Sequence, residues 1–274
     1  MVIPDIENPH VSTLIQKTQN YAHQSGYSVI LSITNNDVEL EKKYIETLLH
    51  KGVDGVIVNH TVDTRGKKYL QELVDEGIPI VLLGRIEGLE IDSLLSDIEK
   101  GVYLLIEHLI KLGHKRIVFL KGHTTQYRVT GYKSALDKYN IPVDENLIIE
   151  HGQKLEDLPG IVDRILLINP RPTAVFGFND YLAIGLVTLL EERGIRVPDD
   201  MAVVGLDNIN LSKYARVPLT TVDLKPDLVA KGSIDLIINK ITNGKNNGYK
   251  FQSITIEPEM IIRQSCGSDK LTSR

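Results

Sequence analysis

Polar side chains follow two apolar runs in the segment 171–208, and they are the groups of the chain best suited to bind a ligand. Asn179-Asp180 comes directly after the run TAVFGF, and Asp207-Asn208 comes after MAVVGL. If both runs are parallel strands, their carboxyl ends meet at one edge of a sheet, where ligands of open α/β folds bind. The sequence therefore predicts that these side chains share a site.

Other polar groups follow other apolar runs in the same way. Arg128 lies in YRVTGYKSAL after the run RIVFL, Arg85 follows IPIVLL, and His10 follows Asn8-Pro9 after VIPDI. Carboxylate, carboxamide and guanidinium groups together suit a neutral polyol, because each hydroxyl both donates and accepts a hydrogen bond. This mixture of groups predicts a sugar-like ligand.

Each candidate also has a purely structural interpretation. Asp180 stands where a helix N-cap belongs, and capping is the favoured role for it because a cap satisfies free amide groups. Asp207 could equally form a turn, since Asx side chains bond their own backbone. For Arg128 the plain alternative is a solvated helix surface, and for His10 it is a turn at a helix start.

The elements that must position these groups alternate along the chain. Short β-branched runs are separated by amphipathic stretches, which predicts βαβ units and a parallel, doubly wound sheet. The runs are VIPDI, YSVILSI, DGVIV, IPIVLL, RIVFL, LIIE, TAVFGF and MAVVGL. In the predicted helix 98–112, a buried stripe has helical spacing. It comprises Val102, Leu105, Ile106, Leu109 and Ile110.

Length and composition predict two lobes. With 274 residues, of which 42% are hydrophobic, the chain can fill two cores. After Val217-Pro218 the pattern changes to a short extended run, a helix at about 225–243 and antiparallel strands around Pro258, which together form a multi-strand hinge. We predict an N-terminal subdomain of 1–114 plus 222–249, a C-terminal subdomain of 115–221 plus 250–266, and a disordered tail, 267–274.

Charge and missing motifs exclude several functions. The formal net charge of −5 argues against a nucleic-acid surface in this chain. A single cysteine, Cys266, offers no disulfide or metal-ligand spacing, and no run is long enough to span a membrane, so the sequence predicts a cytoplasmic protein. We find no GxGxxG after the first strand, no GxxxxGK[ST] and no GxSxG, and expect neither cofactor, metal nor catalytic residues.

The order of the motifs resembles that of a known family. From the start to about Cys266, the chain carries VIPDIENPH, GYSVILSITNND, KGVDGVIV, HLIKLGHKRIVFLKG, RVTGYKSAL, RPTAVFGFNDYLAIG, RGIRVPDDMAVVGLDN and PEMIIRQS. This combination resembles the effector-binding region of the lactose-repressor (LacI/GalR) regulators. The resemblance implies an α/β fold like that of type I periplasmic binding proteins, with two Rossmann-like, doubly wound subdomains and a multi-strand hinge.

The resemblance also implies roles for individual residues. Arg128 in RVTGY, Asn179 in FND and Asp207 in GLDN match the family's effector contacts, and His10 falls where an aromatic residue often packs on the ligand. Phe176 or Phe178 could supply a stacking face. With Arg85 these residues form the predicted ligand-binding set. The chain departs from the family pattern in having Gly84-Arg85 where many members have Asp-Arg, and in having no tryptophan.

The function implied is that of a repressor's sensing domain. A sugar or sugar phosphate would bind between the lobes and act allosterically on operator DNA through a helix-turn-helix domain that this chain lacks, in a homodimer. Regulators of another family with a winged-helix domain can also carry such an effector module, so the type of DNA-binding domain stays open. The abrupt start in a strand agrees with a missing upstream segment. A solute-binding receptor of a sugar transporter is the alternative, but it should begin with a leader or a lipid-anchoring cysteine. An enzyme of doubly wound fold is a weaker alternative.

Overall fold

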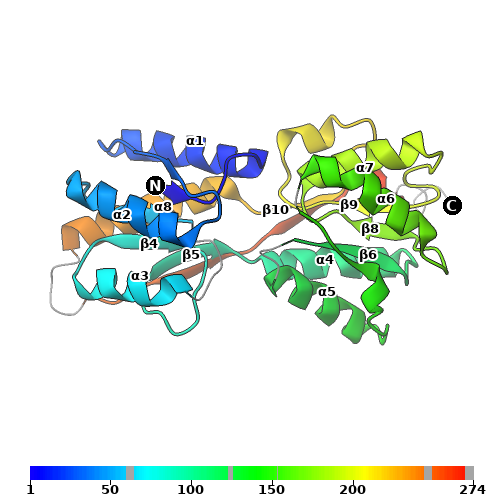
Figure 1. The fold of residues 1–274 in the computed structure, drawn as a ribbon, viewed down its shortest axis with the longest axis horizontal. Helices are drawn as coiled ribbons and strands as arrows, with labels where there is room; N and C mark the ends of the chain where they lie inside the picture. Colours follow the sequence, from blue (N-terminus) through cyan, green and yellow to red (C-terminus); the bar gives the residue numbers. More distant parts are fainter. Residues whose placement is uncertain (60–64, 123–125, 153, 244–248, 269–274) are drawn as a thin grey trace. The chain divides into compact units, whose positions relative to one another are not determined.

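In the computed structural model, the chain forms two compact α/β units (Figure 1). The structure describes residues 1–59, 65–122, 126–152, 154–243 and 249–268. Unit 1 comprises Met1–Ser96 with Lys225–Ile256, and unit 2 comprises Asp97–Leu224 with Glu257–Arg274. The chain therefore passes from one unit to the other after Ser96, after Leu224 and after Ile256.

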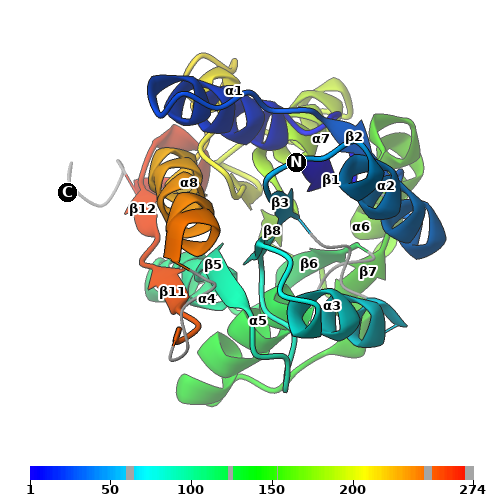
Figure 2. The same cartoon turned by 90° about the vertical axis from the view of Figure 1, so that its left-hand side faces the viewer.

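Unit 1 is a parallel sheet covered by helices on both faces (Figure 2). Among the described residues its strand order is β11-β5-β4-β3-β1-β2. The strands are β1 (Val2–Ile3), β2 (Ser32–Ile33), β3 (Val56–Val58), β4 (Ile80–Leu83), β5 (Asp92–Ser96) and β11 (Ser253–Ile256). The helices are α1 (Pro9–Gln24), α2 (Val38–His50), α3 (Arg65–Asp75) and α8 (Pro226–Asn243).

Alternation along each strand of unit 1 divides its core into two clusters. Ile57 and Val81 face a cluster with α1 and α8, whereas Val56 and Ile80 face a cluster with α2 and α3. Successive side chains of a strand point to opposite faces, so strands covered on both sides are apolar throughout. This explains why the runs DGVIV and IPIVLL read as continuous apolar segments.

Unit 2 repeats this plan with a smaller sheet. Its described strands include the parallel order β7-β6-β8-β9 and the antiparallel pair β10-β12. The strands are β6 (Ile117–Lys121), β7 (Ile148–Glu150), β8 (Ala174–Phe176), β9 (Ala202–Val204), β10 (Thr221–Asp223) and β12 (Glu259–Ile261). The helices are α4 (Ile98–Lys111), α5 (Gln126–Lys138), α6 (Leu158–Leu167) and α7 (Asp180–Glu192), with short 3-10 turns at Glu145–Leu147, Leu155–Asp157, Asn210–Lys213 and Gln264–Cys266.

Helices α4 and α5 lie side by side on one face of the four-stranded sheet, and α6 and α7 cover the other (Figure 1). The predicted stripe of α4 is confirmed. Its members Val102, Leu105, Ile106 and Leu109 are fully buried, and Ile110 is partly buried against the same cluster.

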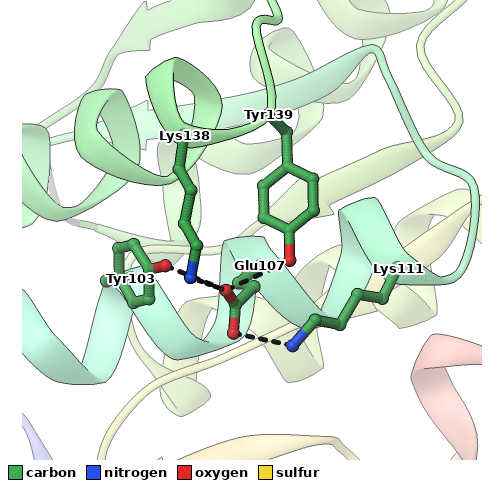
Figure 3. Close-up of polar contacts among 5 residues, drawn as sticks. All are labelled: Tyr103, Glu107, Lys111, Lys138 and Tyr139. Carbon is green, nitrogen blue, oxygen red and sulfur yellow. Dashed lines mark hydrogen bonds and ion pairs between the residues drawn. The ribbon is translucent and has the colours of Figure 1, made fainter.

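A carboxylate also joins α4 to α5. Glu107 of α4 accepts hydrogen bonds from Lys138 (2.9 Å) and Tyr139 (3.2 Å) on α5 and just beyond it, and from Tyr103 (2.8 Å) and Lys111 (2.9 Å) on its own helix (Figure 3). We call these five residues the Glu107 cluster. The hydrogen bonds from Lys138, then from Lys111, lower the pKa of Glu107 to about 2, so it is charged at neutral pH.

The predicted domain boundaries need correction. The boundary at 114/115 is wrong because α4 packs on α5 and belongs to unit 2, so the first crossing lies after Ser96. The second crossing lies after Leu224 rather than before residue 222. The strands around Pro258 are also not paired with each other. β11 pairs in parallel with β5 of unit 1, whereas β12 pairs with β10 of unit 2.

The predicted disordered tail, 267–274, falls mostly outside the described residues, which end at Ser268. Within the described ranges, no helix is both long enough and apolar enough to cross a membrane.

Candidate functional site

The strands of unit 2 deliver polar residues to one edge of their sheet. All four strands of the order β7-β6-β8-β9 are parallel. Their carboxyl ends therefore lie together, as the crevice rule requires. Arg128 follows β6, His151 follows β7, Phe178 follows β8 and Asp207 follows β9. We call these four residues the strand-end site.

Arg128 is the cation of this site. It lies in the first turn of α5, and its guanidinium carbon is 4.3 Å from the centre of the Phe178 ring, which is a cation–π distance. Burial lowers the pKa of Arg128, and the nearby Asp207 carboxylate opposes that shift. The guanidinium is thus held between an aromatic face and a negative charge, which is a different environment from a solvated helix surface.

Phe178 contacts Arg128, and little of its surface is exposed to a ligand. It has a positive φ of 65°, which turns its side chain away from the β8 direction. Only 4% of its surface is exposed. The His151 ring meets it edge-on, with ring centroids 5.2 Å apart. A stacking role toward a ligand remains a prediction for Phe178, and the structure adds a role in fixing Arg128.

Asn179, and not Asp180, caps helix α7. The Asn179 side chain accepts a hydrogen bond from the Leu182 amide (2.9 Å), which is the usual N-cap contact. The expectation that Asp180 caps the helix is therefore wrong, because the helix begins one residue earlier than that assignment requires. Asn179 is 7% exposed, and a ligand contact through it remains a prediction.

Asp207 and Asn208 form a turn with unusual backbone geometry. Their φ values are 113° and 51°, in the region that L-residues other than Asn and Asp rarely adopt. The backbone bends at Leu206-Asp207, whereas the predicted bonding of these side chains to their own backbone remains a prediction. Asp207 is 4% exposed, and its charge acts on both Arg128 and Asp180. A ligand role for Asp207 does not conflict with the turn, since the turn determines where the carboxylate lies.

A second carboxyl group lies behind Asp207. Asp180 is fully buried at the start of α7, and its oxygens accept hydrogen bonds from the Thr221 hydroxyl and the Ile209 amide (3.0 Å). Burial, followed by the negative charge of Asp207, raises the pKa of Asp180 well above its usual range, while Arg263 acts in the opposite direction. The charge of Asp207 thus acts on a buried carboxyl group as well as on Arg128.

Phe176 does not belong to the site. It is fully buried in the core beneath α4 and α5, with its ring stacked on Phe119 at a centroid distance of 5.3 Å. As the last residue of β8, it points to the face of the sheet that α4 and α5 cover. The prediction that Phe176 contacts a ligand is wrong for this reason.

His10 and Arg85 belong to unit 1, and they follow β1 and β4 of its parallel sheet. His10 is half-buried in the first turn of α1, where its amide donates to the Asn8 cap (2.9 Å). Its Nδ1 is buried and has no hydrogen-bond partner among the described residues. Arg85 is exposed. Ligand contacts through these two residues remain predictions.

Sequence reasoning did not single out two residues that complete the polar network, Thr221 and Arg263. The Arg263 guanidinium donates to Asn208 Oδ1 (2.7 Å), and Thr221 bonds Asp180. Neither residue follows a strand of the main sheet, so the crevice rule could not find them. Within the described residues there is also no group of three or more His, Cys, Asp or Glu side chains suited to hold a metal ion.

Comparison with known proteins identifies the family. Residues 106–266 match the periplasmic binding protein-like domain. An HTH-type transcriptional repressor PurR from Vibrio atlanticus is 34% identical over 272 residues, covering 97% of this chain and 80% of the repressor. A PurR repressor from Haemophilus influenzae is 30% identical, covering 98% of this chain and 81% of its own length. The chain belongs to the LacI family of transcriptional regulators.

Solved structures agree with this assignment. A LacI-family regulator from Enterococcus faecium with bound ribose is 28% identical, with a TM-score of 0.82 over 96% of this chain and 97% of that one. The transcription regulator CcpA of Lactococcus lactis is 27% identical, also with a TM-score of 0.82, 96% coverage of this chain and 97% of its own. The predicted fold, an α/β periplasmic-binding-protein-like architecture with parallel sheets in two subdomains, is confirmed.

Proposed function

We propose that this LacI-family chain is the effector-sensing domain of a bacterial transcriptional repressor. It binds a small sugar or sugar phosphate, and binding is coupled to operator DNA through a helix-turn-helix domain that lies outside this chain. The cytoplasm is its place of action, because the operator is there. The repressor names of its relatives favour this function over that of a transporter's receptor.

One observation carries the ligand class. Arg128, held on Phe178 beside Asp207, offers fork-like donors next to a carboxylate acceptor at the strand ends of one sheet. A sugar hydroxyl needs both a donor and an acceptor, so adjacent hydroxyls can bridge the two groups. A ribose-bound relative of 28% identity supports this choice. His10, Arg85 and Asn179 are the further contacts in the proposal.

Binding without turnover is sufficient for this function. An effector shifts an equilibrium between two conformations only by the difference in its affinity for them. The coupling is reciprocal, so operator DNA would change effector affinity by the same factor. We therefore propose no catalytic role for any of these residues.

A thermal-shift screen tests the proposal. D-ribose, other pentoses and hexoses, and their phosphorylated forms are each added to the purified chain, and a ligand that binds the folded chain raises its melting temperature, the more so the higher its concentration relative to Kd. At least one member of the panel should stabilise wild type, and the same member should fail to stabilise Arg128→Ala. Arg193→Ala, which removes an arginine at the C-terminus of α7 that is paired with Asp163 of α6, is the matched control and should respond like wild type.

We also propose that the chain forms a homodimer, with unit 2 contributing to the contact. Leu211 and Tyr214 lie three residues apart at the 3-10 turn Asn210–Lys213, and 53% and 73% of their surfaces are exposed. Residues at this spacing share a face of a 3-10 turn. Sedimentation velocity should show a dimer for wild type and for Leu167→Asp, a change at an exposed leucine of α6. It should show a monomer for Tyr214→Asp; a dimer in that variant would exclude this surface.

A further inference from the structure

The turn that carries Asp207 needs support from elsewhere in the fold. Asp207 and Asn208 both have positive φ values, 113° and 51°, which few L-residues adopt without compensation. The backbone before them is close to α7, because a Cβ on Gly205 would collide with Asp180 Oδ1. The turn is therefore packed directly on the Asp180 carboxyl group.

Successive amides of this turn are bonded by strand β10 and by Asp180. The Asp207 amide donates to the Val222 carbonyl (2.9 Å), and the Asn208 amide donates to the Thr221 hydroxyl oxygen (3.3 Å). The Ile209 amide donates to Asp180 Oδ2 (3.0 Å). The Thr221 hydroxyl in turn donates to Asp180 Oδ1. One carboxyl group thus ties the turn to β10.

Arg263 secures the same turn from another segment. Its guanidinium donates to Asn208 Oδ1 (2.7 Å), Ser212 Oγ (3.0 Å) and the Leu219 carbonyl (2.8 Å). The positive charge of Arg263 and the negative charge of Asp207 both act on Asp180. The charged groups that influence Asp180 thus include the site carboxylate and a fixed guanidinium.

Strand β10 gives this arrangement a special position in the chain. It ends at Asp223, and unit 2 passes into unit 1 after Leu224. Thr221, the residue bonded to Asp180, lies three residues before that crossing. The Asp207 turn is therefore joined to the strand that leads to this crossing by two hydrogen bonds, one to Val222 and one to Thr221.

We propose that Asp180 is a positioning residue of the effector site, whose carboxyl group fixes the 207–209 turn to β10 and so places the Asp207 carboxylate beside Arg128. It acts through Asp207 and does not touch the ligand. The inference rests on the proposed function only in treating Asp207 as an effector contact. Asp180 also links that contact to the strand leading out of unit 2.

Amide hydrogen exchange of the ligand-free chain tests this directly. In Asp180→Ala the amides of Asn208 and Ile209 should exchange at least about tenfold faster relative to those of the core strand β8. Ile209 loses its acceptor, and the Thr221 hydroxyl that accepts from Asn208 loses the carboxylate that fixes it. In Asp180→Asn the exchange should stay close to wild type, since the amide oxygen still accepts from Ile209 and the amide nitrogen can donate to Thr221. Asp37→Ala, which removes the cap of α2 in unit 1, should leave the turn unchanged.

Two outcomes would overturn the inference. One is unchanged exchange at residues 207–209 in Asp180→Ala, and the other is an equal acceleration throughout unit 2, which would mean a general loss of stability. Because no ligand is needed, failure of every sugar in the thermal-shift panel would overturn the proposed function and leave this result standing. For a sugar that binds wild type, Asp180→Ala should weaken affinity by about tenfold, and Asp180→Asn by much less.

Discussion

Glu107 and Asp180 are carboxyl groups of the same unit, and 9% and 0% of their surfaces are exposed. The charged groups around them nevertheless differ. Glu107 accepts hydrogen bonds from two lysines and two tyrosines (Figure 3), which lower its pKa to about 2. Asp180 has a second carboxylate, Asp207, as its neighbour, and its pKa is raised. Burial alone therefore does not distinguish a structural carboxylate from one at a binding site.

The two carboxyl groups differ in which charged side chains surround them. The donors of the Glu107 cluster belong to α4, α5 and the residue after α5, and two of them, Lys111 and Lys138, are positively charged. The charge of Asp207 acts on Asp180 and on Arg128, and the charge of Arg263 also acts on Asp180. Like charges kept close together are costly, and such arrangements concentrate at functional sites. The raised pKa belongs to the carboxyl group next to the proposed effector contact Asp207, and the lowered one belongs to the Glu107 cluster.

The largest effect on stability is expected from Glu107→Ala. This change removes the acceptor of four hydrogen bonds, two of them from charged groups, and should lower the free energy of unfolding by about 2 kcal/mol. The lysine side chains are more than half exposed, so water can replace part of the loss. Urea unfolding followed by circular dichroism measures it. Glu145→Ala, at an exposed pair with Lys133, is the control and should stay within about 0.5 kcal/mol.

A loss for Glu107→Ala no larger than for Glu145→Ala would show that the Glu107 cluster does not hold α4 to α5.

The contributions of Glu107 and Asp180 to the stability of the fold should change with pH in opposite directions. The lowered pKa of Glu107 contributes stability that is present above the ordinary value of 4.5 and is lost as pH falls toward about 2. The raised pKa of Asp180 contributes stability that is present below the ordinary value of 3.8 and is lost as pH rises through its folded value. Asparagine does not titrate, so the melting temperature of Asp180→Asn should gain on wild type as pH rises from 4 to 8.

For Glu107→Gln the deficit relative to wild type should instead shrink on acidification from pH 5 toward 2.5. A melting-temperature difference between wild type and Asp180→Asn that does not change with pH would mean that the pKa of Asp180 is not raised in the folded chain, and would remove the contrast with Glu107.

The smallest effect is expected within the Glu107 cluster itself. Tyr139→Phe removes the longest of the four hydrogen bonds, 3.2 Å, and should cost about 0.5 kcal/mol, whereas Tyr103→Phe removes a 2.8 Å bond and should cost about 1 kcal/mol. Urea unfolding of the two variants at pH 7 compares them directly. The reverse order would indicate that the tyrosines pack in the cluster without contributing through their hydroxyl groups.

Much of the fold could be predicted from the sequence because its strands are buried on both faces. DGVIV, IPIVLL and RIVFL read as strands, and β3, β4 and β6 lie there. Strand β5 was not predicted, because Asp92, Ser93 and Ser96 make its sequence polar; Asp92 is satisfied by the Tyr249 hydroxyl and the Gln252 amide. Those partners lie about 160 residues away in the sequence, so the local sequence pattern around Asp92 cannot predict them.

The positions of the candidate site residues could also be predicted in part. Arg128, Asn179 and Asp207 each follow a strand, and in a parallel sheet the position after a strand fixes the edge; their contacts with a ligand remain predictions. Phe176 was misassigned because one residue along a strand decides which face a side chain occupies. Thr221 and Arg263 act from outside the main sheet, so only the folded chain brings them to the Asp207 turn.

Whether Arg128 binds the effector is tested by calorimetric titration of wild type, Arg128→Ala and Glu107→Gln with the sugars and sugar phosphates of the thermal-shift panel. Losing a charged hydrogen-bond donor costs about 1.5–3 kcal/mol, which corresponds to an affinity loss of roughly ten- to a hundredfold. The strand-end site predicts this loss in Arg128→Ala, with little change in the melting temperature of the ligand-free protein, and wild-type affinity in Glu107→Gln. Unchanged affinity in Arg128→Ala, or no binding of any panel member to wild type, would contradict it.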